Sequence, residues 1–251
     1  MAATVVGRLL TQQYRQQQLA VRARALQMLI ALWPLMDVRR IDETWLAMEP
    51  ALLAAVERGR AESAALSSAY YRALRAAEGI EGAVEVPPLE ALNVAQVQTS
   101  LRVTGPVVAK QLVEMGRADA ASRALVTLSG AMTRHVLQGG RATVLGAAEA
   151  DTKATGRKVG WARVTSADPC YFCAMLASRG PVYTRESSDF KAHDACACTA
   201  EPMWRDSRSS WPPRSREWRD LYNESTRDAP SGELLQAFRR AYEGRKGRAA
   251  A

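Results

Sequence analysis

All four cysteines of this 251-residue sequence lie in one short stretch, and one of its two histidines lies among them. Cys170 and Cys173 form a Cys-x-x-Cys pair, and His193, Cys196 and Cys198 follow about twenty residues later, a separation common in zinc modules. Cys-x-x-Cys places two thiolates about one tight turn apart, which suits two corners of a tetrahedron, and zinc takes Cys and His ligands in that geometry. The pattern predicts a structural zinc site with five candidate ligands for four positions.

Which of the candidates complete the site stays open at this level. A Cys-x-Cys pair in a strand points both side chains to one face, so Cys196 and Cys198 can both serve. Three other interpretations remain: reduced thiols in a small β-rich lobe, a redox Cys-x-x-Cys, and a disulfide. No signal peptide is visible, so the chain is expected in the cytoplasm, where disulfides rarely persist.

The composition indicates a mainly helical protein with a basic surface. Apolar residues make up 47% of the chain, aromatic residues 6%, and the net charge is +8. Long stretches of Ala, Leu, Arg, Glu and Gln are typical of helices. The basic charge permits an acidic partner or nucleic acid. The most apolar run, residues 26–36, is too short to span a bilayer and contains Pro34, so no membrane contact is expected.

Hydrophobic periodicity divides the chain into three parts. Residues 1–155 are expected to be helical, residues 156–203 to form a small α+β Cys/His module, and residues 204–251 to form a Trp- and Arg-rich helical tail. Within the first part, the pattern predicts helices over 5–33, 43–58 with Asp42 as N-cap, and 61–77, a linker near 79–88, and a helical block over 89–154 with breaks near Gly105–Pro106, Gly116 and Gly139–Gly140.

Within the other two parts the predicted elements are short. Alternation predicts strands over 161–164 and 181–183, with a turn at Asp168–Pro169 and one helical turn over 173–177. The tail is expected to hold surface helices over about 215–222 and 232–244, and to fray beyond residue 244.

The module also resembles a known family. The stretch from Trp161 through Asp168, Cys170 and Cys173 to Gly180, followed by His193-Asp-Ala-Cys196-Ala-Cys198, is similar to the C-terminal module of MuF-like head morphogenesis proteins of tailed phages, particularly the actinobacteriophage type. The resemblance covers about 40 residues. In that family, too, a helical region precedes the cysteine module.

The resemblance implies a function in the phage head. It implies a minor capsid protein encoded beside the portal, assembled in the host cytoplasm and incorporated into the virion head in few copies. Its expected partners are the portal or the major capsid protein, and possible further partners are the scaffold and packaged DNA. An internal head protein associated with DNA is therefore one alternative function.

Members of this group of phage head proteins are often labelled capsid maturation proteases. A protease would need a nucleophile, a base and an orienting acid among the residues of this sequence. A cysteine protease would use Cys170 or Cys173 with His193 and an acid such as Asp168 or Asp194. A nucleophile does not need three other cysteines nearby, however, and a metal-bound thiolate is a poor nucleophile. A zinc hydrolase would need an open coordination position. The sequence favours a closed structural site without catalytic residues, and the protease is the enzyme alternative.

Several other residues have two interpretations. His135, in the helical block, is expected to be structural rather than catalytic, and Asp168 to form a turn. The tail tryptophans Trp204, Trp211 and Trp218 either anchor on a partner or fold back over their own domain. The segment from Gln12 to Gln18 is a solvated helix face or an oligomer contact. Arginines of the tail are expected in a solvated helix, since acidic residues lie between them.

Overall fold

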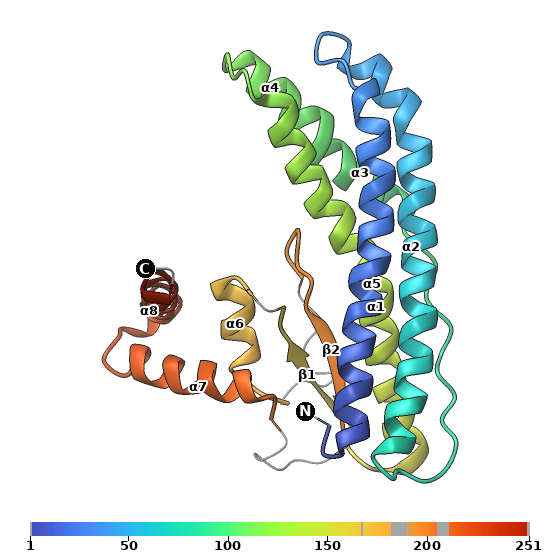
Figure 1. The fold of residues 1–251 in the computed structure, drawn as a ribbon, viewed down its shortest axis with the longest axis vertical. Helices are drawn as coiled ribbons and strands as arrows, with labels where there is room; N and C mark the ends of the chain where they lie inside the picture. Colours follow the sequence, from blue (N-terminus) through green and yellow to red (C-terminus); the bar gives the residue numbers. More distant parts are fainter. Residues whose placement is uncertain (1, 167, 182–189, 191, 205–210, 250–251) are drawn as a thin grey trace.

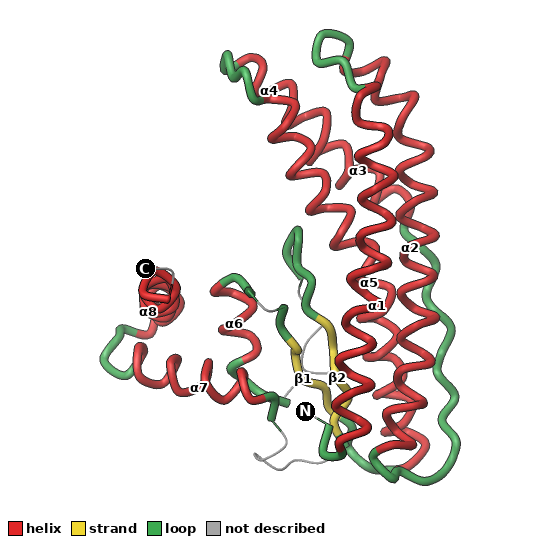
Figure 2. Tube along the Cα trace, in the orientation of Figure 1, coloured by secondary structure: helices red, strands yellow, loops and turns green. Residues whose placement is uncertain are grey.

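The computed structural model describes residues 2–166, 168–181, 190, 192–204 and 211–249. Its frame is a bundle of three long helices, α1 (Val5–Leu32), α2 (Ile41–Ala77) and α5 (Ala120–Thr155) (Figure 1). Three shorter helical segments cover one end of the bundle, namely α3 (Val94–Arg102), the π-helical η2 (Val103–Val107) and α4 (Val108–Glu114). Figure 2 shows a mostly helical chain with one small sheet among the described residues, which confirms the predicted fold class.

The first helix begins and ends where the sequence predicts. The Thr4 hydroxyl accepts a hydrogen bond from the Gly7 amide at 2.9 Å, which caps the first turn. Pro34 lies in a short 3₁₀ turn, η1 (Trp33–Leu35), that follows directly. No helix in the described part of the chain combines the length and the hydropathy that a membrane crossing would require.

The second helix corrects the prediction of two separate helices. Residues 41–77 form one helix that contains Pro50 and Gly59, and its buried stripe runs on past the glycine. Gly59 lies against Val136 of α5, where a Cβ would come within 3.0 Å of a methyl group. Asp42 is not the N-cap, which is Arg40. It lies in the first turn instead and pairs with Lys110 at 2.6 Å.

The predicted break at Gly139–Gly140 is also wrong, because α5 runs straight through it. Both glycines face α2: the Gly140 amide donates to the Ser63 hydroxyl at 2.9 Å, and a Cβ on Gly139 would overlap the Arg60 carbonyl oxygen. The glycines therefore serve close helix packing rather than a turn. At Gly105–Pro106 the chain stays helical as a π turn, whereas Gly116, with φ of +70°, does follow the end of α4.

The small sheet pairs β1 (Gly160–Val164) with β2 (Thr199–Met203) in antiparallel register, Gly160 opposite Met203 and Val164 opposite Thr199. The strand predicted over 161–164 is confirmed. The strand over 199–203 was not predicted, and residues 182–183 of the predicted strand 181–183 lie outside the described residues. Cys196 and Cys198 precede β2 instead of lying in a strand.

The C-terminal helices form a second cluster beside the sheet (Figure 1). Helix α6 (Tyr171–Ala177) packs against α7 (Pro213–Thr226) and α8 (Leu234–Ala249), with η4 (Ser231–Glu233) between the last two. Both predicted tail helices are present and longer than expected, and α8 extends through residue 249, past its predicted end at residue 244. Their shared apolar core consists of Ala174, Ala177, Trp218, Leu221, Phe238 and Tyr242.

The tail tryptophans fold back over their own chain. Trp218 is buried in the tail core, and the Trp204 indole donates to Asp151 of α5 at 2.7 Å. The indole of Trp211 lies directly against Gly180, whose φ of +71° and missing Cβ make room for the ring. None of the three is therefore available as a fully exposed anchor for a partner.

One apolar core joins the lower half of the bundle to the cysteine-bearing segment. Tyr14, Tyr71 and Val144 of the bundle belong to the same buried cluster as Trp161 and the cysteines Cys173, Cys196 and Cys198. The cysteines thus lie against the helical bundle, whose other half has a second core of its own. The domain boundaries drawn from the sequence stay a prediction.

The packing of α5 on α2 can be tested with two glycines of the same helix. We expect Gly139→Ala to lower the free energy of unfolding by about 1–3 kcal/mol, because its methyl group would meet the backbone of α2. Gly146→Ala should be neutral or stabilising by up to about 1 kcal/mol, since only Pro87 lies near, at 3.6 Å. Urea unfolding measures both. Equal effects would contradict the close contact.

Candidate metal centre

The Cys-x-x-Cys pair lies at the start of α6. Cys170 is the N-cap of that helix, and its sulfur accepts a hydrogen bond from the Cys173 amide at 3.4 Å. A thiolate is the better acceptor, and it also gains from the helix dipole at this end. The predicted single turn over 173–177 is a helix of seven residues that begins at Tyr171.

The other half of the cluster is a tight turn pinned to α5. The Cys196 amide donates to the His193 carbonyl at 3.2 Å, and Ala195 within the turn has a φ of +62°. The Ala195 amide donates to the Gly130 carbonyl of α5 at 2.9 Å. A Cβ on Gly130 would come within 3.1 Å of Asp194, so a small residue is needed at this contact.

The two halves bring all five predicted candidates together. The Nε2 atom of His193 lies 3.0 Å from the Cys170 sulfur and 3.2 Å from the Cys173 sulfur. The Cys173 sulfur lies 3.6 Å from that of Cys196. Cys198 completes a second group with Cys173 and Cys196, whose sulfurs lie within 4.8 Å of one another. Cys173 therefore belongs to both groups of donor atoms.

These three spacings are close to those between neighbouring ligands of a tetrahedral metal ion, within two groups of donor atoms that share Cys173. Bonds of about 2.3 Å to sulfur and 2.0 Å to nitrogen give donor-to-donor edges of about 3.5–3.8 Å. The separations of 3.0–3.6 Å between the sulfurs and the His193 nitrogen come close to those edges. All four cysteines are free thiols, so the disulfide interpretation does not describe this structure.

The protons of the cluster are unevenly shared. Hydrogen bonds to Cys173 and then to His193 lower the pKa of the Cys170 thiol to about 4. The hydrogen bond to Cys170 raises the pKa of His193 to about 9, and hydrogen bonds to Cys173 and Cys198 lower the pKa of the Cys196 thiol. The pKa of Cys173 is raised in turn, because it donates to its neighbours. Without metal, the cluster holds thiolates beside a protonated imidazole.

A buried arginine of β1 faces the sulfurs. Arg163 is 2% exposed, and its Nη1 atom lies 3.8 Å from the Cys196 sulfur and 4.0 Å from the Cys173 sulfur. Its guanidinium group also lies 3.8 Å from the ring centroid of Phe190. A cation beside thiolates offsets their negative charge in an interior where an uncompensated charge is costly.

A second buried arginine holds the backbone of the cluster from α5. Arg141, also 2% exposed, donates to the Cys196 carbonyl at 2.6 Å and to the Cys198 carbonyl at 3.1 Å. The two charged hydrogen bonds fix the segment that carries both cysteines into β2. Neither Arg141 nor Arg163 was predicted from the sequence to belong to the site. The one available signal was that each interrupts an otherwise apolar or small-residue stretch.

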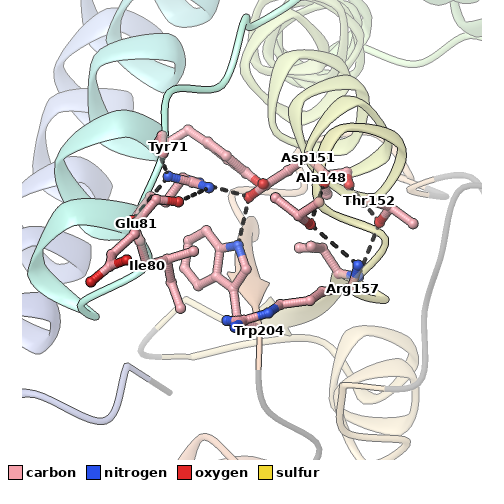
Figure 3. A network of polar contacts seen from close by, with 12 residues as sticks. Tyr71, Ile80, Glu81, Ala148, Asp151, Thr152, Arg157 and Trp204 are labelled. Atoms are coloured by element: carbon pink, nitrogen blue, oxygen red, sulfur yellow. Dashed lines mark hydrogen bonds and ion pairs between the residues drawn. The ribbon is translucent and has the colours of Figure 1, made fainter.

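A further buried polar network lies around Asp151 of α5, beside the end of β2 (Figure 3). The Asp151 carboxylate of α5 accepts hydrogen bonds from Tyr71 and Arg75 at 3.0 Å and from the Trp204 indole at 2.7 Å. Arg75 also donates to the carbonyls of Ile80 and Glu81 at the start of the linker. Asp151 thereby ties α2, the linker and the end of β2 to one point of α5.

The two candidate acids of a protease do not orient His193. The Asp194 carboxylate pairs with Arg134 at 2.7 Å, and Asp168 pairs with Lys246. The His193 Nδ1 atom lies 2.6 Å from the backbone carbonyl of Asp194 instead. Asp168 lies in a bend, as the predicted turn role requires.

His135 is separate from the cluster and buried in α5. It is 8% exposed, and its Nε2 atom has no hydrogen-bond partner among the described residues. Burial, followed by the nearby charge of Arg134, lowers the pKa of His135 to about 4. The imidazole is therefore neutral at pH 7, in line with the structural role expected for it.

Comparison with known proteins identifies relatives across most of the chain. A family model described as VG15 protein matches residues 8–225, a range that includes the bundle and the Cys/His cluster. A "Gene 15 protein" of Mycobacterium phage D29 is 32% identical over 145 residues, which cover 57% of this chain and 50% of that protein. The chain thus aligns to about half the length of this relative. No solved structure matches it significantly. The predicted resemblance to phage head-morphogenesis-type proteins is confirmed at the level of the family.

The contact from Arg141 to the cysteine segment can be tested by substitution. We expect Arg141→Met to lower the free energy of unfolding by about 1.5–3 kcal/mol per lost charged hydrogen bond, because the Cys196 and Cys198 carbonyls would be left buried without this donor. Arg58→Met, on the exposed surface of α2, is the control and should cost less than about 0.5 kcal/mol. Chemical unfolding compares the two, and a similar loss in both would contradict the role of Arg141.

The burial of His135 gives a pH dependence with a definite sign. The unfolded chain takes up the proton near pH 6.5 and the folded chain near 4, so His135 costs stability as the pH falls between these values. His135→Leu should therefore gain stability relative to wild type as the pH falls from 7 to 4. The measurement is the difference in unfolding free energy at each pH, in which the unchanged His193 cancels. A constant difference would show that His135 titrates normally.

Proposed function

This chain belongs to the VG15 protein family, and we propose that it works as a minor capsid, or head morphogenesis, protein of a tailed bacteriophage, associated with the virion head. The observation that carries the proposal is the family match over residues 8–225 together with a phage relative. Its partners in this proposal are the portal and the major capsid protein, with the scaffold as a further partner during procapsid assembly.

The Cys/His cluster has a structural role in this proposal. Cys170, Cys173, His193 and Cys196 would hold one zinc ion, since their donor atoms form an unbroken series of contacts of 3.0–3.6 Å. Cys198 stands beside them as a fifth candidate ligand. Zinc bound by three thiolates and one imidazole would clamp the start of α6 to the turn on α5. Arg163 would offset the excess negative charge of such a site.

The metal can be tested directly. Purified protein should contain about one zinc ion per chain. Removal of the zinc by a chelator should lower the unfolding temperature, because a metal ion that binds the folded state stabilises that state. Cys170→Ser and Cys196→Ser should each lose the metal, whereas Cys198→Ser should retain it. Elemental analysis gives the zinc content. A well-folded protein without metal would contradict the site, and loss of zinc in Cys198→Ser alone would contradict the proposed ligand set.

The proposed location of the chain in the virion head can be tested separately. Mass spectrometry of purified virions should find this chain in few copies per particle, compared with many copies of the major capsid protein. A phage with the gene interrupted should yield fewer DNA-filled heads in electron micrographs, and the gene supplied in trans should restore them. Absence of the chain from both virions and procapsids, with normal heads in the mutant, would exclude the proposed function.

One observation favours an enzyme as the second candidate. The Cys170 sulfur lies 3.0 Å from the His193 Nε2 atom, a distance that suits the nucleophile and base of a cysteine protease, although the described part of the chain provides no carboxylate to orient the imidazole. The test incubates the major capsid protein with wild type and with Cys170→Ser. Cleavage that survives zinc removal and vanishes in the folded variant would favour the protease. The structural proposal expects no cleavage in either case.

A further inference from the structure

Helix α1 has a second face, opposite to the one it buries in the bundle. Its buried positions, which face α2 and α5, are Gly7, Thr11, Tyr14, Gln18, Val21, Ala25 and Leu29. On the other side, a strict alternation of four- and three-residue steps connects Val5, Leu9, Gln12, Gln16, Leu19, Ala23, Leu26 and Ile30. We call these eight residues the outer seam. Such spacing is the a/d pattern of a coiled coil, and the helix extends for about 42 Å.

The outer seam exposes large apolar side chains to solvent. Val5 is 64% exposed, Leu9 60%, Leu19 44% and Ile30 60%, while Leu26 is half-buried against the core of the bundle. Helix α1 runs along the outside of the bundle, in front of α5 (Figure 1). The two glutamines of the seam and its alanine are also exposed. Polar residues at a few core positions of a coiled coil fix its register at some cost in stability.

The charges beside the seam have one sign. Arg8, Arg15 and Arg22 recur every seven residues at the g position, which directly precedes an a residue, and α1 contains no acidic residue at all. In coiled coils the e and g positions form ion pairs that select the partner. The neighbouring helix α2 supplies Glu62, which is already paired with Arg24. The g flank of the seam is therefore basic, with Arg8 exposed, Arg15 half-buried, and Arg22 half-buried and donating to the Thr133 hydroxyl of α5 at 3.2 Å.

We propose that the outer seam of α1 docks an acidic amphipathic helix of a partner protein, in coiled-coil packing with acidic residues beside the arginine row. The inference does not rest on the proposed head function, because it uses only the spacing, exposure and charge of α1.

The charge pattern distinguishes this partner from two others. A second copy of the chain is disfavoured, because an antiparallel pair would bring the two arginine rows together. In a parallel pair the arginines would face Gln13, Ala20 and Gln27, which offer no negative charge. Nucleic acid would use the arginines but would leave the apolar residues without a partner surface.

A designed peptide pair tests the proposal on the full-length protein. The probe is a capped helical peptide as long as α1, with Leu at its a and d positions and Glu at its e and g positions. The control peptide has the same sequence with Lys in place of every Glu. Calorimetric titration should show binding of the Glu peptide and none of the Lys peptide.

The arginine row has its own variants. Arg8→Glu together with Arg22→Glu should weaken binding of the Glu peptide by roughly tenfold or more, because the ion pairs beside the outer seam would be lost. Arg58→Glu together with Arg72→Glu is the matched control, because it makes the same change of net charge at exposed positions of α2. That control should bind the Glu peptide as wild type does.

The apolar part of the seam is tested separately. Leu9→Asp together with Leu19→Asp should also weaken binding of the Glu peptide by roughly tenfold. Val113→Asp together with Val126→Asp is the matched control, since these residues are 43% and 70% exposed on other helices, and it should bind as wild type does. All positions changed on α1 lie outside its buried stripe, although Arg22 also donates to Thr133 of α5, and circular dichroism and thermal unfolding check that each variant keeps its fold.

Three results would overturn the proposal. One is equal binding of the Glu and Lys peptides, or equal loss in a control variant. Another is self-association of the chain that the Leu9/Leu19 variant abolishes, which would assign the seam to a second copy. The third is duplex DNA binding that is lost in the Arg8/Arg22 variant while the Glu peptide fails to bind, which would assign the face to nucleic acid.

Discussion

The position of the cysteine-bearing segment depends on the contact that Arg141 makes from the middle of α5. A guanidinium group with 2% exposure reaches the carbonyls of Cys196 and Cys198, so a charge is buried in order to hold two backbone groups in place. Burying a charge is costly unless strong hydrogen bonds compensate it, and removing one partner leaves the rest unsatisfied. The Gly130 carbonyl and the Asp151 carboxylate act at other points of the same helix. Helix α5 is thus the wall on which the module is assembled.

This arrangement explains how a two-stranded sheet and one short helix can be ordered. So small a set of elements buries little apolar surface of its own, and it shares the core of the bundle through Trp161 and the cysteines. Backbone contacts to α5 position the turn that carries His193 and Cys196, and the cap of α6 positions Cys170 and Cys173. A zinc ion between these two halves would join elements that are already close, and Arg163 would balance its thiolates.

The sequence was sufficient for the residue types of the site and for most helices, because Cys/His spacing and helical periodicity are local signals. It failed where tertiary packing decides. Helix ends were expected between residues 58 and 61 and at Gly139–Gly140, but Gly59, Gly139 and Gly140 lie where α2 and α5 pack closely, and a Cβ on Gly139 or Gly140 would overlap α2. The strand over 199–203 exists through pairing with β1, which periodicity does not reveal. Arg141 and Arg163 could not be assigned, since a single arginine in sequence gives no sign that it is buried and faces a cysteine cluster.

The central claim is that the two cysteine-bearing halves, held by α5 and α6, converge on one metal ion. X-ray absorption spectroscopy of the zinc-loaded full-length protein tests it most directly, because the technique identifies the atoms bonded to the metal. The account predicts a shell of three sulfurs at about 2.3 Å and one nitrogen at about 2.0 Å. A shell of oxygen and nitrogen without sulfur would place the metal elsewhere and contradict the account.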